Sequence, residues 1–224
     1  MSHWVEREGR RANRNLLITN VVLLVGTILI FVLNPNIDYR SDYVPIAIGV
    51  GVLLLAGWNC IKAMRRSSEI QTTPVWRHAA VYGNVEQLAS QIEQDQQMGK
   101  TKYGKLLLTQ AWLIRRNFFS TWVSPLADLA WVYKKVTKHY TNFIPTGKSY
   151  AAVIVGRHRQ RIEVQMSQKK TDQFLADLAT RVPWAIFGYS KEIETAWQKD
   201  PGGFVATVDS RHEQLASKSV AAKS

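Results

Sequence analysis

The sequence predicts an α+β protein in which an apolar helical hairpin precedes a small antiparallel sheet with flanking helices. Three observations support this fold class. Residues 16–33 and 43–61 are uncharged, residues 100–161 contain strand-like segments punctuated by Gly and Pro, and residues 167–182 repeat apolar side chains at helical spacing. We expect the following parts: a basic N-terminus at 1–15, the hairpin at 16–63, a helical connector at 64–99, a sheet domain at 100–204 and a flexible tail at 205–224.

The two uncharged runs have the length of membrane-spanning helices. The first run, taken as a helix that rises 1.5 Å per residue, covers roughly 27 Å, which is close to the thickness of a bilayer core. A hairpin buried in a soluble protein is one alternative, but two consecutive uncharged runs of this length are rare in soluble cores. A cleaved signal peptide is another, but the first run exceeds the usual apolar length of roughly 7 to 15 residues and no small-x-small cleavage site follows.

The flanks of the two runs predict their orientation. Only Arg40 lies in the connecting loop, whereas the outer flanks contain Arg7, Arg10, Arg11, Arg14, Lys62, Arg65 and Arg66. Because cytoplasmic flanks carry an excess of Lys and Arg, both termini are expected in the cytoplasm. Ala47 and Gly51 form a small-x-x-x-small pair, which lets helices pack closely unless it faces lipid.

Nearly all of the formal net charge of +12 comes from one block, residues 100–161, which holds twelve cations and the single acid Asp128. The segments 62–99 and 162–224 are each neutral. An excess of cations favours polyanionic neighbours. The candidate binding residues of this block are Arg115, Arg116, Lys134, Lys135, Lys138, Arg157, Arg159 and Arg161.

Four interpretations of the basic block remain open. The cations can contact anionic phospholipid headgroups, dock an acidic partner protein, bind single-stranded nucleic acid, or form a solvated face with no specific ligand. Nucleic acid is the weakest of the three binding interpretations, because stacking on bases needs exposed aromatic rings. Trp112, Trp122 and Trp131 lie within apolar strands and are expected in the core. Homo-oligomers also fit the sequence.

The remaining elements are predicted from turns and caps. The segment 150–156 and the segment 161–166 should pair as a hairpin with a basic tip. The stretch 73–95 predicts two short helices broken at Gly83-Asn84, and Ser190 is expected to cap a last helix whose first turn holds Glu192 and Glu194.

Strands followed by one closing amphipathic helix, after a two-span hairpin, resemble the pleckstrin-homology-like (PH-like) domains of small bacterial membrane proteins. The residues that carry the resemblance are "LLLTQAWLI", "VSPLADLAWVY" and the hairpin plus helix of 150–182. It covers about 80 residues, and its motifs are patterns of residue type. It implies a PH-like domain at 100–204 on the cytoplasmic side of a bacterial inner membrane.

The sequence contains no clear catalytic motif. "TGKS" ends like a phosphate loop, but Asn142 stands where that motif needs glycine and an apparent strand follows. The five histidines follow no metal motif and Cys60 is the single cysteine, so we expect no metal site and no cofactor. We therefore expect a non-catalytic, membrane-anchored binding or scaffold protein. An accessory subunit of a larger membrane assembly and a membrane enzyme remain as alternatives.

Overall fold

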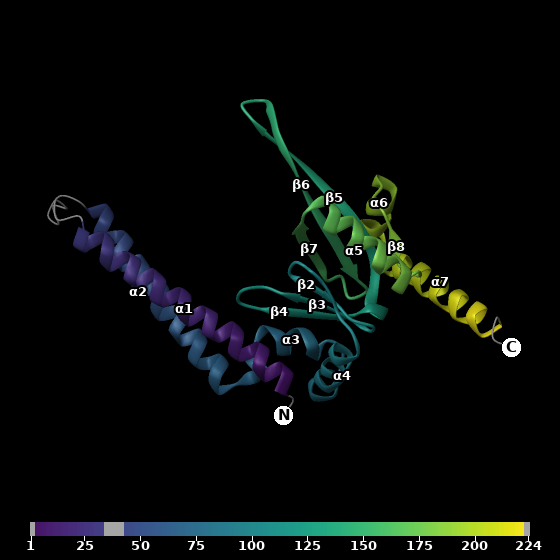
Figure 1. Ribbon diagram of the computed structural model, residues 1–224, viewed down its shortest axis with the longest axis horizontal. Helices are drawn as coiled ribbons and strands as arrows, with labels where there is room; N and C mark the ends of the chain where they lie inside the picture. The colour runs from purple at the N-terminus through teal and green to yellow at the C-terminus, as the bar shows by residue number, and fades with distance from the viewer. Residues whose placement is uncertain (1–2, 34–42, 222–224) are drawn as a thin grey trace. The chain divides into compact units, whose positions relative to one another are not determined.

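The computed structural model describes residues 3–33 and 43–221, and it divides the chain into two compact units (Figure 1). The first unit holds residues 1–93 and 116–122, and the second holds residues 94–115 and 123–224. The expected α+β class is confirmed: helices come first and a region of antiparallel sheet follows. The loop that contains Arg40 lies outside the described residues.

The first unit is helical. Its elements are α1 (His3–Leu33), α2 (Tyr43–Ser68), the 3-10 helix η1 (Ile70–Thr72), α3 (Pro74–Ala80) and most of α4 (Val85–Met98). The predicted break at Gly83-Asn84 is confirmed, and the positive φ of Gly83 suits a residue between two helices. Within α1 and α2, the segments Trp4–Leu29 and Ala47–Ser68 are long and apolar enough to cross a membrane.

Helices α1 and α2 pack through small and amide side chains. Gly49, Ala56 and Ala63 are buried at seven-residue intervals along α2, a period that keeps one face of a helix toward a neighbour. On α1, the buried Asn20 donates to the carbonyl of Ala56 at 3.4 Å and accepts from Asn59 at 3.0 Å. Such amide bonds between apolar helices fix which faces meet.

The second unit contains two sheets, apart from residues 116–122 at the β3–β4 turn, which belong to the first unit. The first has the order β1-β2-β3-β4, built from β1 (Thr101–Tyr103), β2 (Leu106–Leu108), β3 (Trp112–Arg116) and β4 (Thr121–Pro125), and the short helix η2 (Leu126–Asp128) follows it. The second has the order β7-β6-β5-β8, built from β5 (Leu129–Thr141), β6 (Ile144–Gly156), β7 (Arg161–Met166) and β8 (Ile186–Phe187). Strands β6 and β7 pair antiparallel, which confirms the expected hairpin.

Two sets of helices cover opposite faces of β5, whose side chains alternate between faces. Lys134 pairs with Asp172 of α5 (Gln168–Arg181) at 2.7 Å on one face. On the other face, Trp131 packs against Phe204 of α7 (Pro201–Ala221) with ring centroids 6.1 Å apart. Trp112, Trp122 and Trp131 are all buried, as the sequence predicts.

Near the C-terminus, one prediction is confirmed and another is wrong. Ser190 caps α6 (Lys191–Lys199) by accepting from the backbone N–H of Ile193, which confirms the predicted cap. Residues 205–221, expected in a flexible tail, instead continue α7. The carboxylate of Asp200 accepts from the N–H of Gly203 at 2.9 Å, and Phe204 and Val208 are buried, so a cap and a packed face hold this helix.

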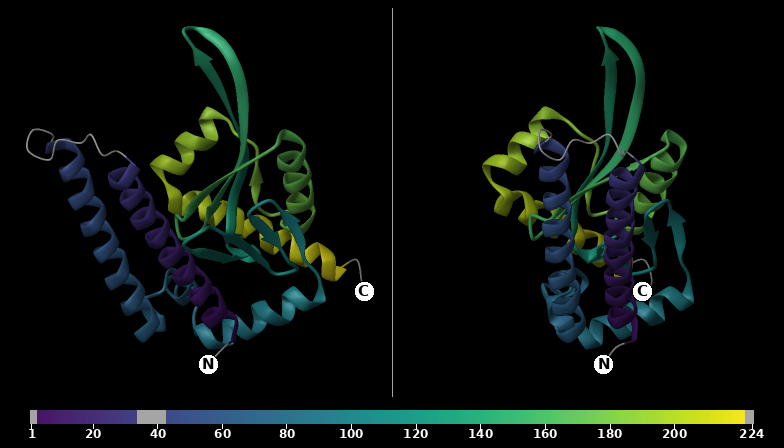
Figure 2. Two further views of the ribbon diagram at one scale, coloured as in Figure 1. Left: turned by 60° about the vertical axis from the view of Figure 1, so that its left-hand side comes forward. Right: turned by 90° about the vertical axis from the view of Figure 1, so that its left-hand side faces the viewer.

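Strands β5 and β6 continue past the end of β7 as a two-stranded arm, residues 136–149, which projects from the rest of the second unit (Figures 1 and 2). Its turn consists of Asn142 and Phe143, both with positive φ, as a two-residue hairpin turn requires. Phe143 is 99% exposed. The "TGKS" sequence lies inside strand β6 and not before a helix, as expected.

Tyr103 of β1 connects the first sheet to α5. Its ring packs edge-on against Phe174, and its hydroxyl donates to the carboxylate of Asp177. Burial, together with the hydrogen bond to Asp177, raises the pKa of Tyr103 to about 12.

Because of this raised pKa, the free energy of unfolding depends on pH in the alkaline range. An unfolded tyrosine loses its proton near pH 10, about two units before the folded one, so the contribution of Tyr103 to stability is full below pH 10 and is lost toward pH 12. We expect the free energy of unfolding to fall less steeply between pH 10 and 12 in Tyr103→Phe than in the wild type. Equal slopes in the two proteins would contradict this assignment.

Candidate functional site

The polar end of α1 carries a buried carboxylate. Glu8 is 4% exposed and contacts three side chains: Arg11 at 2.9 Å, Arg116 at 2.7 Å and Thr121, whose hydroxyl donates to it at 2.9 Å. Arg116 and Thr121 flank the turn between β3 and β4, in the stretch that belongs to the same unit as α1. Because a buried carboxylate is costly unless it is paired and hydrogen-bonded, this network fixes the turn to the helix.

The turn itself, residues 117–120, makes further contacts with α1. The side chain of Asn15 donates to the carbonyl of Phe118 at 2.7 Å, and Arg11 donates to the carbonyl of Asn117 at 3.4 Å. The N–H of Asn117 donates to the carbonyl of Ser120 at 2.8 Å and closes the turn. Phe118 and Phe119 remain 55% and 40% exposed.

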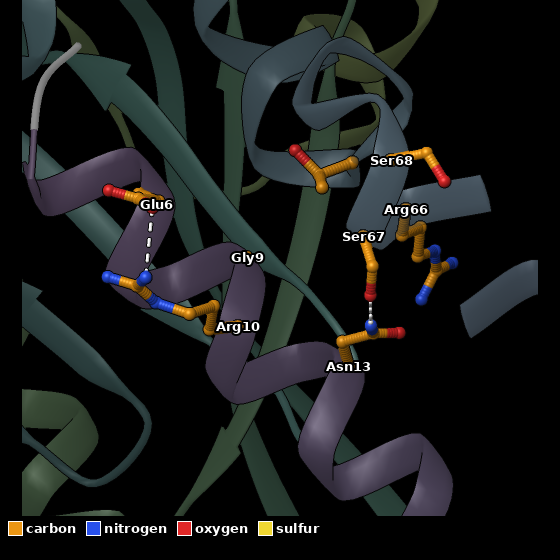
Figure 3. Close-up of a pocket in the computed structure, with 8 residues that line it drawn as sticks. Glu6, Gly9, Arg10, Asn13, Arg66, Ser67 and Ser68 are labelled. Atoms are coloured by element: carbon orange, nitrogen blue, oxygen red, sulfur yellow. Dashed lines mark hydrogen bonds and ion pairs between the residues drawn. The ribbon is translucent and has the colours of Figure 1, made fainter. Parts of the chain in front are cut away.

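A pocket of about 410 Å³ lies between the polar ends of α1 and α2 (Figure 3). Asn13 donates to the hydroxyl of Ser67 at 2.6 Å and to the carbonyl of Ala63 at 3.0 Å, which joins the two helices at one edge of the pocket. The lining residues are Glu6, Gly9, Arg10, Asn13, Arg66, Ser67, Ser68 and Thr73.

The pocket contains donors suited to an anion. Among the described residues that line it, two buried atoms have no hydrogen-bond partner: Nη1 of Arg66, a donor, and Oδ1 of Asn13, an acceptor. Arg77 adds a second positive charge near Arg66, while Arg10 is already paired with Glu6 at 2.9 Å. Guanidinium and hydroxyl groups gathered in one pocket are the donors that bind phosphate oxygens in proteins.

A second hollow of about 620 Å³ runs along the basic side of α1. It shares Arg10 and Asn13 with the first pocket, and its other lining residues are Arg7, Arg11, Arg14 and Leu17. The described polar end of α1 therefore presents positive charge on two adjoining sides.

The predicted basic residues do not form one patch in the second unit. Lys134 pairs with Asp172 at 2.7 Å on one face of β5, and Lys135 pairs with Glu163 at 2.9 Å on the other. Lys138 lies on the arm, roughly 30 Å along β5 from Leu129, whose partner Gly156 precedes Arg157.

Three of the other predicted cations, Arg116, Arg157 and Arg161, also have structural partners. Arg157 pairs with Asp209 of α7 at 2.7 Å, and Arg161 donates to the hydroxyl of Tyr133 at 2.9 Å. Arg159 is exposed in the turn between β6 and β7. Arg115 lies in β3, where burial lowers its pKa, and Arg116 belongs to the Glu8 network. Anion binding by these residues stays a prediction.

Ala47 and Gly51 lie on the exposed side of α2 and not on the face toward α1. A Cβ atom added at Gly51 would meet no atom within 4 Å. Packing of this pair against a further helix stays a prediction.

Sequence reasoning missed the contacts of Glu8 and Asn15 with the 117–120 turn, and it missed Asn13 as part of the pocket. The available signal was the position of two carboxylates, Glu6 and Glu8, within a segment otherwise rich in arginine. The distant partners of Glu8, Asn13 and Asn15 lie in α2 and in residues 116–121, far along the chain, and no local pattern points to them. Among the described residues, no group of three or more His, Cys, Asp or Glu side chains is placed to hold a metal ion.

Comparison with family models matches residues 82–197. This stretch includes α4, all strands of both sheets, α5 and most of α6. Comparisons with curated proteins and with solved structures found no match. Because the matched stretch covers more than half of the chain, the protein belongs to the family described as domain of unknown function DUF6709.

Proposed function

We propose that this chain is a non-catalytic binding protein, anchored by two spans in a bacterial inner membrane, that binds anionic phospholipid headgroups at the polar ends of α1 and α2. In this proposal both termini lie in the cytoplasm. The observation that carries the headgroup assignment is the pocket in which Arg66 and Asn13 keep buried polar atoms that no described residue pairs with. The cytoplasmic domain is PH-like, in keeping with strands β1–β7 followed by the amphipathic α5.

The membrane assignment is supported by the surfaces of α1 and α2. Large apolar side chains are exposed along both helices, and Val22 and Leu54 are 64% and 71% exposed. A helical hairpin in a soluble core would bury such side chains, whereas in a bilayer they contact lipid tails. The cations at the polar ends of both helices support this proposal, because cations flanking a span favour headgroup level on the cytoplasmic side.

Phosphate chemistry fits the pocket at this level. The phosphate of an anionic lipid brings oxygens that accept from the guanidinium of Arg66 and from Ser67 or Ser68. The glycerol headgroup of phosphatidylglycerol supplies hydroxyls that donate to Asn13 Oδ1, a buried acceptor of the pocket. Phosphatidylglycerol offers both groups, so we choose it as the probe.

The test uses full-length protein in phosphatidylcholine vesicles that contain a trace of spin-labelled phosphatidylglycerol. We expect Arg66→Gln to weaken the association constant of the labelled lipid about fivefold, which corresponds to roughly 1 kcal/mol for one cation at an anionic headgroup. Arg65→Gln is the matched control, because it removes the same charge from the adjacent position, outside the pocket.

Two results would contradict the proposal. The first is a wild-type protein that holds labelled phosphatidylglycerol no better than labelled phosphatidylcholine. The second is equal weakening by Arg65→Gln and Arg66→Gln, which would indicate diffuse attraction to the leaflet and no headgroup site in the pocket.

A further inference from the structure

The 117–120 turn presents two aromatic side chains that the fold leaves uncovered. Phe118 and Phe119 contact each other edge to face, with ring centroids 4.9 Å apart, and both remain exposed. They are flanked on one side by Arg115 and Arg116. Paired exposed aromatic rings next to cations are typical of surfaces that enter the interface of a bilayer, where rings contact acyl chains and cations contact phosphates.

Contacts with α1 set the level of the turn along that helix. Asn15, which donates to the carbonyl of Phe118, is the last residue before the uncharged run that starts at Leu16. Arg11, one helical turn earlier, donates to the carbonyl of Asn117. The backbone of the turn that carries the phenyl rings is therefore bonded to α1 at the boundary between its charged and its apolar part.

The turn is also held in place before any lipid binds. Two contacts with the carboxylate of Glu8, from Arg116 and Thr121, fix both of its ends, and the Asn117–Ser120 backbone hydrogen bond closes it. A preformed loop loses little conformational freedom on entering the bilayer.

We infer that the 117–120 turn is a membrane-inserting loop, which places Phe118 and Phe119 in the headgroup region of the leaflet that receives the polar end of α1. The occupant is the bilayer, because the turn is bonded to α1 at Asn15, and the next exposed side chains along that helix, Leu17 and Ile18, are apolar. The loop thus gives the chain a third membrane contact besides its two spans. This inference shares with the proposed function only the premise that α1 and α2 span a membrane.

The test measures the depth of spin labels in full-length protein reconstituted in phosphatidylcholine vesicles. Cys60 is replaced by Ser, and single labels are introduced by Phe118→Cys and Phe119→Cys. Collisions with oxygen, which concentrates in lipid, are compared with collisions with a neutral nickel chelate, which stays in water. Ser90→Cys, at an exposed position of α4, serves as the aqueous control. Leu54→Cys, at an exposed position of α2, serves as the bilayer control.

We expect the labels at 118 and 119 to favour oxygen over the nickel chelate, with a depth between those of the two controls. Asn15→Ala should shift the label at 119 toward the aqueous control, because it removes the hydrogen bond to the turn. Asn13→Ala is the matched control: its side chain bonds to α2 and not to the turn, so the label should not move.

Three outcomes would overturn the inference. Labels at 118 and 119 that match Ser90 would place the turn in water. Low access to both reagents would mean that protein, from a partner or a second copy of this chain, covers the rings. A label at Leu54 that collides with the nickel chelate as often as the label at Ser90 would contradict the premise that α1 and α2 span a membrane. Loss of the phosphatidylglycerol preference alone would defeat the proposed function and leave the inserted loop standing, since insertion is expected in neutral vesicles.

Discussion

Glu8→Gln is expected to release the 117–120 turn from α1. The substitution keeps the shape of the side chain but removes the charge that pairs with Arg116 at 2.7 Å and Arg11 at 2.9 Å. Breaking a fully buried pair costs about 3–5 kcal/mol, and because both arginines retain some exposure we expect about 2–3 kcal/mol here. The measurement is trypsin cleavage after Arg116 under native conditions, which should become roughly 30- to 150-fold faster.

Glu6→Gln is the matched control for this change. Glu6 lies two residues away on the same helix and pairs with Arg10 at 2.9 Å, but this pair is exposed and spaced four residues apart. Such a pair contributes only about 0.3–0.5 kcal/mol, so cleavage after Arg116 should barely change. Equal acceleration by Glu6→Gln and Glu8→Gln would show that the turn responds to the net charge of α1 and not to the buried network.

Trp131→Ala is expected to destabilise the second unit by about 3–5 kcal/mol, the usual range for removing a large aromatic side chain from a core. Trp131 is 3% exposed, and its indole N–H donates to the carbonyl of Gly188 at 2.8 Å. Its ring also contacts Phe204 of α7. We expect the amide hydrogens of α7 near Phe204 to lose their protection from exchange before those of β6, because the helix loses its aromatic contact with β5.

Two further variants separate packing from the hydrogen bond of Trp131. Trp131→Phe keeps an aromatic ring but removes the donor to Gly188, and it should cost clearly less than Trp131→Ala. Trp197→Ala truncates a partly buried tryptophan that packs at the edge of the same cluster, and it should also cost less. Unchanged protection of α7 in Trp131→Ala would mean that other contacts hold this helix in place.

The sequence predicted the local structure well, because the determinants are themselves local. The β6–β7 hairpin, the cap at Ser190 and the helix break at Gly83 each depend on residues within one or two turns of the chain. The burial of Trp131 followed in the same way from its position in an apolar strand.

The partners of charged residues could not be predicted, because they depend on tertiary contacts. The alternation along β5 separates Lys134 from Lys135, but only the folded structure places Asp172 and Glu163 opposite them. The helical ending of the chain was missed for a related reason. Gly202 and Gly203 suggest a break, yet Asp200 caps the helix at this point and Phe204 anchors it against β5.

The buried position of Glu8 has a consequence for the order in which the protein assembles. Thr121 lies 113 residues after Glu8, so the ribosome synthesises this partner on the order of 10 s after Glu8 itself. During that interval the carboxylate can pair only with neighbours such as Arg11, because the 117–120 turn has not yet been made. Synthesis of α1 and the closing of the Glu8 network are therefore separate events during biosynthesis, and the second waits for the β3–β4 turn to be made.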